Sequence, residues 1–145
     1  MILVKKIPVE ETYPIRLAVL RPNKTLKDCI FTHDEDKSTF HLGVFVDDQL
    51  ACIGSFYFQK HPYFKEEDQC QLRGMATLHE YQGKGLGTML LRKAFEIFLD
   101  NGIELFWCNA RTSAMPFYQK LELVTIGGEF EVPEIGPHYV MYCRM

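Results

Sequence analysis

The feature that most limits how this chain can fold is a glycine-rich turn between a predicted strand and a predicted helix. Residues 71–78 begin polar and become apolar, which is typical of a strand that enters a core. Three glycines in five positions follow, at 83, 85 and 87. An apolar stripe of helical period then begins, made of Leu86, Leu90 and Ala94, with Leu91, Phe95 and Phe98 beside it.

A strand, a glycine turn and a helix in this order are suited to bind an anion. The first N–H groups of a helix have no partner inside it, and the helix dipole favours negative charge there. Glycine lets the backbone approach a ligand closely, and Lys84 adds a cation. The spacing is neither that of a phosphate-binding Walker A loop nor that of a dinucleotide fingerprint. The alternative is a helix N-terminus with a glycine turn and no ligand.

The turn resembles the acetyl-CoA signature of the GNAT superfamily of N-acetyltransferases, Gln/Arg-x-x-Gly-x-Gly/Ala. Gln82, Gly85 and Gly87 match this signature, and residues 75–81 resemble the family's strand and turn. His79 departs from the family, which commonly has proline there. The resemblance implies that acetyl-CoA is bound as a co-substrate by Met75, Ala76, Thr77, Gln82, Gly83, Lys84, Gly85, Leu86, Gly87 and Thr88.

A second stretch, residues 109–123, resembles the family's Asn-x-x-Ala-x-x-x-Tyr-x-x-x-Gly-Phe motif. Tyr118 is in place, which implies a catalytic general acid. Arg111 occupies the asparagine position and Asn109 lies two residues earlier, so both are candidate CoA-binding residues. Glu122 replaces the motif's glycine, which leaves the shape of this helix end open. The alternatives are a core aromatic role for Tyr118 and a solvated Arg111.

His138 follows Gly136-Pro137 and is the second catalytic candidate. If the chain has the GNAT fold, the resemblance implies that His138 lies near the entrance for the acceptor. A histidine there can deprotonate an ammonium group or shape the acceptor pocket. A structural histidine at the start of a strand is the alternative. The general base itself is left unassigned.

The order of predicted elements indicates a single α+β domain over residues 1–145. It runs strand (2–7), one or two helices (from Glu10 to Arg21, and 25–30), strands 39–46, 49–59 and 71–78, helix, strand 103–108, helix 114–121, and two strands. This is the element order of the GNAT fold. We therefore expect a mixed, mostly antiparallel sheet, splayed between two central parallel strands, with helices on both faces.

Charge and cysteine usage exclude several classes of partner. The 145 residues carry a formal net charge of −3, which argues against nucleic acid or an anionic membrane as the main partner. The five cysteines and five histidines are scattered, so we expect no metal site and mostly buried thiols.

No apolar run has membrane-spanning length, and we expect a cytoplasmic protein that is compatible with a homodimer. The acidic loop 32–36 is expected to be a solvated turn.

Together these features predict transfer of an acetyl group from acetyl-CoA to a primary amine. The amine of a small molecule or a peptide would attack the thioester directly in a ternary complex, with no metal. Two alternatives stay open. The chain could be a CoA-binding sensor without turnover, or it could acetylate a protein N-terminus or lysine.

Overall fold

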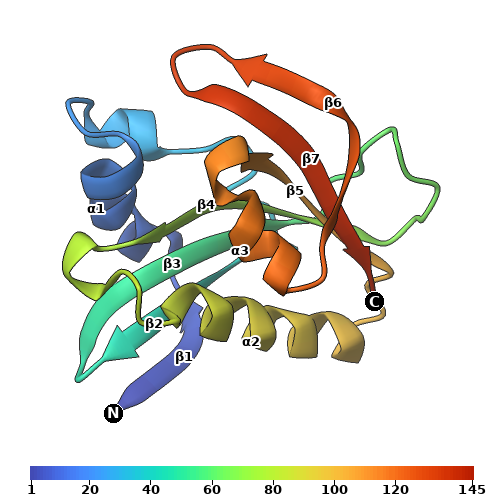
Figure 1. The fold of residues 1–145 in the computed structure, drawn as a ribbon. Coiled ribbons are helices and arrows are strands. Elements are labelled where there is room, and N and C mark those ends of the chain that lie inside the picture. The colour runs from blue at the N-terminus through green and yellow to red at the C-terminus, as the bar shows by residue number, and fades with distance from the viewer. The chain divides into compact units, whose positions relative to one another are not determined.

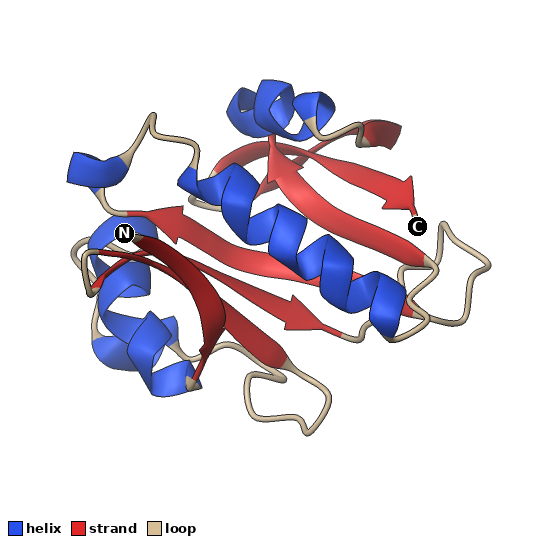
Figure 2. Ribbon diagram, turned by 90° about the horizontal axis from the view of Figure 1, so that it is seen from below, coloured by secondary structure: helices blue, strands red, loops and turns tan.

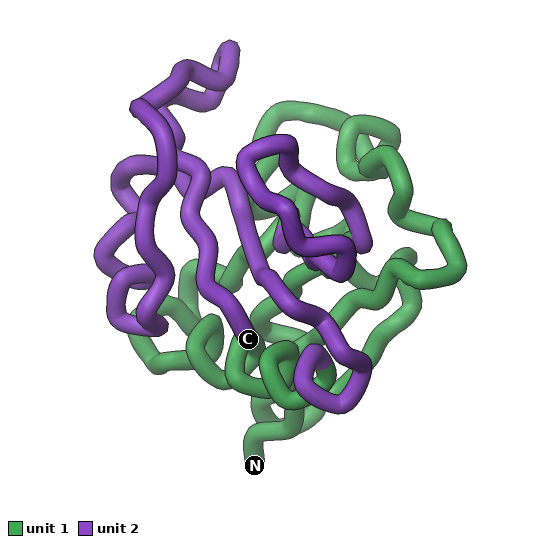
Figure 3. The backbone as a smooth tube through the Cα atoms, turned by 90° about the vertical axis from the view of Figure 1, so that its right-hand side faces the viewer, with its two compact units in different colours: residues 1–57, 73–97 green, residues 58–72, 98–145 purple.

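The computed structural model describes residues 1–145. Its Cα positions group into two compact units (Figure 3). Unit 1 contains residues 1–57 and 73–97, and unit 2 contains residues 58–72 and 98–145. The chain passes from one unit to the other after residue 57, after residue 72 within a strand, and after residue 97 within a helix. The prediction of a single domain stays a prediction.

The strands form one mixed sheet with the order β1-β2-β3-β4-β5-β7-β6. β4 pairs with β5 in parallel, whereas β1–β2, β2–β3, β5–β7 and β6–β7 are antiparallel. The predicted mixed sheet with a central parallel pair is therefore confirmed. The strands, coloured along the chain in Figure 1, are β1 (Ile2–Ile7), β2 (Phe40–Val46), β3 (Gln49–Tyr57), β4 (Gln69–Thr77), β5 (Leu105–Arg111), β6 (Val124–Val132) and β7 (Gly136–Arg144).

One long helix follows the glycine turn, and the remaining helical segments are short (Figure 2). The predicted apolar stripe of the long helix is buried at Leu86, Leu90 and Ala94. The predicted helix that ends near Arg21 is divided into three segments of different hydrogen-bond pattern. The helical segments are η1 (Val9–Thr12), α1 (Tyr13–Ile15), η2 (Arg16–Leu20), η3 (Leu26–Cys29), η4 (His79–Tyr81), α2 (Leu86–Asp100), η5 (Thr112–Ala114) and α3 (Met115–Lys120).

Strand β4 is irregular at Gly74, where φ is +64°. The Arg73 guanidinium lies 4.8 Å from the centre of the Phe31 ring, and a Cβ placed on Gly74 would meet the same ring at 3.0 Å. Successive residues of a regular strand face opposite sides, so two consecutive residues that face one ring identify a bulge. The parallel ladder with β5 involves residues 69–72, just before this point. The bulge therefore lies directly after the point where the pairing of β4 with β5 ends.

The end of α3 shows what replaces the motif's glycine. Glu122 adopts the left-handed conformation with φ of +70°. The amides of Glu122 and Leu123 donate to the carbonyls of Gln119 and Tyr118, at 3.0 and 3.1 Å. This is the hydrogen-bonded helix end that glycine normally supplies, and a side chain there costs roughly 1 kcal/mol. The departure at Glu122 leaves the shape of the helix end unchanged.

Candidate functional site

The glycine turn in unit 1 connects η4 to α2. Gly83 and Gly85 have φ values of +76° and +79°, which side chains rarely adopt. A Cβ at either position would meet no atom within 4 Å. The two glycines are therefore needed for the backbone conformation and leave open space above the turn.

The amides of this turn are available for hydrogen bonds. The first intrahelical bond of α2 runs from the Met89 amide to the Gly85 carbonyl, at 3.1 Å. The six amides of residues 83–88 have no backbone acceptor in the chain. A row of unpaired N–H groups at a helix N-terminus, next to the exposed Lys84, is the arrangement that binds phosphate groups.

Gln82 fixes the turn to the end of β4. Its side-chain amide donates to the Thr77 carbonyl at 3.0 Å and lies 3.4 Å from Nδ1 of His79. Gln82 was predicted to bind the cofactor. In the structure its side-chain amide forms a hydrogen bond inside the protein, so Gln82 positions the turn. Lys84 belongs to the same turn, and its Nζ lies 5.6 Å from the centre of the Tyr81 ring.

The three predicted residues at the end of β4 differ in burial. Ala76 belongs to a buried cluster with Ile7, Ile15 and Ile53, whereas Met75 and Thr77 are half-buried. The Thr77 hydroxyl donates to the Cys52 sulfur at 3.2 Å. Burial raises the pKa of the Cys52 thiol to about 11, so it stays protonated at neutral pH. The structure thus brings the predicted residues 75–77 and 82–88 together within unit 1.

In unit 2, Tyr118 is buried, with 8% of its surface exposed. Its hydroxyl interacts with the thiol of Cys108. Burial and the neighbouring Cys108 raise the pKa of Tyr118 well above its usual value. A phenol in this environment is protonated at neutral pH, so it can donate a proton and cannot act as a base.

His138 and Arg111 are directly opposite each other on β7 and β5. Nδ1 of His138 lies 2.8 Å from the Gly136 carbonyl, which assigns the proton to Nδ1 and leaves the Nε2 lone pair free. Arg111 and Asn109 are exposed residues two positions apart on β5, which extends beyond the predicted end of the strand. They therefore share one face of β5.

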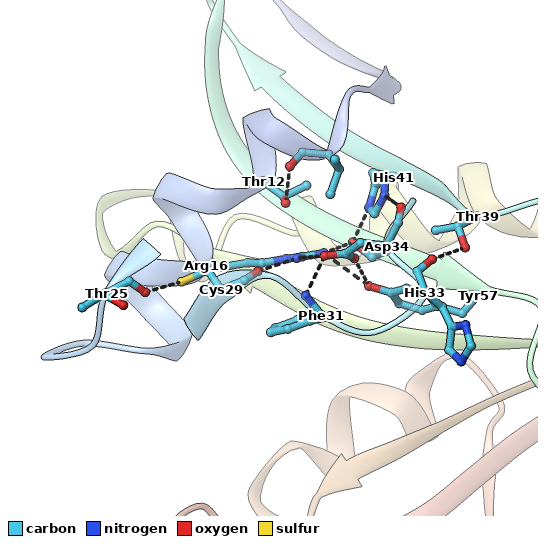
Figure 4. A network of polar contacts seen from close by, with 12 residues as sticks. Thr12, Arg16, Thr25, Cys29, Phe31, His33, Asp34, Thr39, His41 and Tyr57 are labelled. Carbon is cyan, nitrogen blue, oxygen red and sulfur yellow. Dashed lines mark hydrogen bonds and ion pairs between the residues drawn. The ribbon is translucent and has the colours of Figure 1, made fainter. Parts of the chain in front are cut away.

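The expectation of a solvated acidic loop is wrong for Asp34. Asp34 is 5% exposed and forms a buried ion pair with Arg16, with 2.7 Å between Oδ2 and Nη1 (Figure 4). It also accepts hydrogen bonds from the Tyr57 hydroxyl and the Phe31 amide. Arg16 in addition donates to Ser55 Oγ at 2.8 Å and to the Cys29 carbonyl at 2.7 Å. We call Arg16, Asp34, Ser55 and Tyr57 the Arg16–Asp34 network.

Sequence patterns did not identify this network, although a signal was present. Arg16 interrupts the apolar sequence between Ile15 and Leu17, and a charge in that place needs a buried partner. All five cysteines are free, and four are buried as predicted. No group of three or more His, Cys, Asp and Glu residues is arranged to hold a metal ion. None of the helices has the length and apolar character needed to cross a membrane.

The chain is similar in sequence to known proteins. The model of the acetyltransferase (GNAT) family matches residues 7–122. The uncharacterized N-acetyltransferase YitI of Bacillus subtilis is 41% identical over 142 residues, which cover 98% of this chain and 95% of YitI.

Solved structures have the same fold at low sequence identity. The ribosomal-protein-S18-alanine N-acetyltransferase of Escherichia coli aligns with a TM-score of 0.78 at 16% identity, covering 99% of this chain and 94% of that one. ElaA of Escherichia coli aligns with a TM-score of 0.78 at 18% identity, covering 98% and 99%. The family model and the Bacillus relative each span most of the chain. The chain therefore belongs to the GNAT family and is an N-acetyltransferase.

Proposed function

We propose that the protein transfers an acetyl group from acetyl-CoA to a primary amine, by direct attack in a ternary complex. The observation that carries this proposal is the row of six unpartnered amides at residues 83–88. The pyrophosphate of CoA needs several hydrogen-bond donors and a favourable electrostatic field, and the N-terminus of α2 provides both. The open space above Gly83 and Gly85 leaves room for the phosphates to approach the backbone.

The end of β4 supplies the second part of the donor site in this proposal. After the bulge at Gly74, backbone groups of Met75 and Thr77 point the same way and can pair with the amides of pantetheine as another strand would. A backbone N–H at this place can also stabilise the oxyanion that develops on the thioester carbonyl. A hydrogen bond from the Gln82 side chain to the Thr77 carbonyl joins the two parts of the donor site.

Tyr118 is proposed to return a proton to the departing CoA thiolate, a role that rests on its motif position. The raised pKa of Tyr118 keeps its phenol protonated, as a general acid requires. His138 is proposed to act on the acceptor, because its Nδ1 bond leaves Nε2 as a free proton acceptor. Arg111, opposite His138, and Asn109 are proposed to contact CoA from β5.

The acceptor proposed first is the amine of a small molecule. One fold relative from Escherichia coli is a ribosomal-protein-S18-alanine N-acetyltransferase, so a protein N-terminus or lysine is the second class of acceptor. A protein that binds CoA without turnover is the third reading.

One experiment separates these readings. The protein is incubated with acetyl-CoA and a panel of amines, amino acids and peptides, while free thiol and acetylated product are measured. We expect a thiol released for every acetylated small amine, with intersecting initial-velocity lines when both substrates are varied. Parallel lines would contradict direct attack. Product from peptides alone would move the acceptor to proteins, and binding of acetyl-CoA without any product would make the protein a sensor.

A further inference from the structure

Three guanidinium groups surround one aromatic ring in unit 1. The Cζ atoms of Arg16, Arg73 and Arg21 lie 4.1, 4.8 and 5.7 Å from the centre of the Phe31 ring. Phe31 belongs to the loop that carries Asp34, and Arg73 belongs to β4. We call Arg16, Arg21 and Arg73 around Phe31 the arginine cluster.

The chain neutralises only part of this charge. Asp34 is paired with Arg16, and neither Arg21 nor Arg73 forms an ion pair. Glu10, Asp28 and Glu35 are other acids in this neighbourhood, and all three are exposed. Arg21 and Arg73 are half-buried, so their guanidinium groups are partly withdrawn from water and still accessible. Two such cations without a counter-ion favour the binding of an anion.

A second observation indicates that the cluster lacks a hydrogen-bond acceptor. Nε of Arg16 is buried and has no partner, and it is the only side-chain nitrogen or oxygen in this condition. It lies 3.4 Å from the position that a Cβ of Gly74 would occupy. Buried donors are almost always paired in native proteins. The Arg16 donor that lacks an acceptor therefore lies beside Gly74, close to Arg73 and Phe31.

We propose that the arginine cluster binds a carboxylate of the acceptor, so that the substrate is an amine that also carries a carboxyl group. Arginine pairs with planar carboxylates through two parallel N–H bonds, and Phe31 holds the guanidinium planes in place. This inference rests on the proposed function. It adds the chemical class of the acceptor.

The position of the cluster along β4 sets how far the carboxylate lies from the reacting amine. Arg73 is two residues before Met75, where the thioester is proposed to bind. The bulge at Gly74 lies between them, so this separation is at most roughly 7 Å, the length of two residues of a regular strand. A short amino acid whose amine and carboxylate lie within that distance of each other fits the spacing, and a large substrate is not required.

The test compares each acceptor with its own amide. L-Amino acids and β-alanine are assayed beside the corresponding carboxamides, in the wild type and in the Arg73→Gln and Arg21→Gln variants. Arg92→Gln, at an exposed position of α2, is the matched control. We expect kcat/KM for the best acid to exceed that of its amide by about tenfold to hundredfold. Arg73→Gln should remove this preference and leave the kcat/KM of the amide unchanged.

Other outcomes overturn the inference and leave the proposed function standing. Equal kcat/KM values for the acid and its amide in the wild type would overturn it. An equal loss of kcat/KM for both compounds in Arg73→Gln would also overturn it. A preference for 2-aminoethylphosphonate over β-alanine would overturn the assignment to a carboxylate. Calorimetric titration of the same acids into the CoA complex is the second measurement, and it needs no turnover. If no amine is acetylated, the proposed function fails. In that case, binding of the acids to the wild type that is lost in Arg73→Gln still supports the inference. An absence of binding to the wild type contradicts it.

Discussion

The glycine turn and the Arg16–Asp34 network are both built by unit 1, and they use their hydrogen-bonding groups in opposite ways. The turn leaves the amides of residues 83–88 without backbone acceptors. The network buries its charges and pairs every polar side-chain atom except Nε of Arg16 (Figure 4). Groups that are paired inside the protein hold the fold together, whereas groups left unpaired at an open position are available to a ligand.

This difference predicts where mutations act. A change in the network should lower stability and leave the affinity of a folded protein for acetyl-CoA unchanged. A change in the turn should do the reverse. Each prediction below tests one side of this comparison.

The largest effect is expected for Asp34→Ala, which leaves the Arg16 charge buried without a partner. Removal of one member of a buried ion pair typically costs about 3–5 kcal/mol. Asp36→Ala in the same loop is the control, because Asp36 pairs with His33 at an exposed position and such pairs contribute about 0–1 kcal/mol. Urea unfolding of both variants measures the difference. Equal stabilities would mean that the network does not support the fold.

The same network predicts how stability depends on pH. Burial alone would raise the pKa of Asp34, but hydrogen bonds from Arg16, Tyr57 and the Phe31 amide hold it below its usual value. A carboxyl with a lowered pKa in the folded state stabilises the protein above its unfolded pKa, near ~3.9, and loses this contribution as the pH falls. Wild-type stability should therefore fall more steeply below about pH 4 than that of Asp34→Asn. Parallel curves would contradict the assignment.

Tyr118 tests whether a buried polar group can also serve catalysis. Tyr118→Phe keeps the ring and removes only the hydroxyl that faces Cys108. If Tyr118 is the general acid, kcat should fall by about 10²- to 10⁴-fold, or somewhat less, with acetyl-CoA affinity nearly unchanged. Steady-state kinetics and calorimetry measure the two quantities. Full activity with altered stability would place Tyr118 with the structural groups, like Asp34.

The smallest effect concerns Glu122, whose positive φ resembles that of Gly83 but forms the end of α3. Glu122→Gly should raise the free energy of unfolding by about 1 kcal/mol, because glycine adopts this conformation without strain. Kinetic constants should stay the same. A loss of stability on thermal unfolding would mean that the Glu122 side chain makes a contribution larger than the strain.

The sequence predicted most of the fold because its signals are local. The apolar period from Leu86 and the strand-forming runs around Asp47-Asp48 do not depend on the rest of the chain, and the structure has a helix and a hairpin there. The hairpin turn fits, since Asp47 and Asp48 both have positive φ. The Arg16–Asp34 pair was missed because its members are separated by 18 positions and meet only in the folded protein.

The sequence predicted the glycine turn of the candidate site but not the arginine cluster. Glycine spacing identified the turn, since positive φ at Gly83 and Gly85 is a property of the local chain. The arginine cluster depends on the bulge at Gly74, which turns Arg73 toward Phe31. No pattern in the sequence predicts that arginines from two distant segments will contact the Phe31 ring.

The most direct test of the account is the affinity of acetyl-CoA for Gly85→Asp, measured by calorimetry. The substitution places a negative charge above the turn, so we expect binding at least tenfold weaker, or ~1.4 kcal/mol. Gly102→Asp is the matched control, since Gly102 also has a positive φ, of +70°, with no atom near its Cβ position. Gly102→Asp should carry the same backbone strain and bind acetyl-CoA like the wild type. Unchanged affinity in a folded Gly85→Asp protein would contradict the proposal that the turn at residues 83–88 binds CoA.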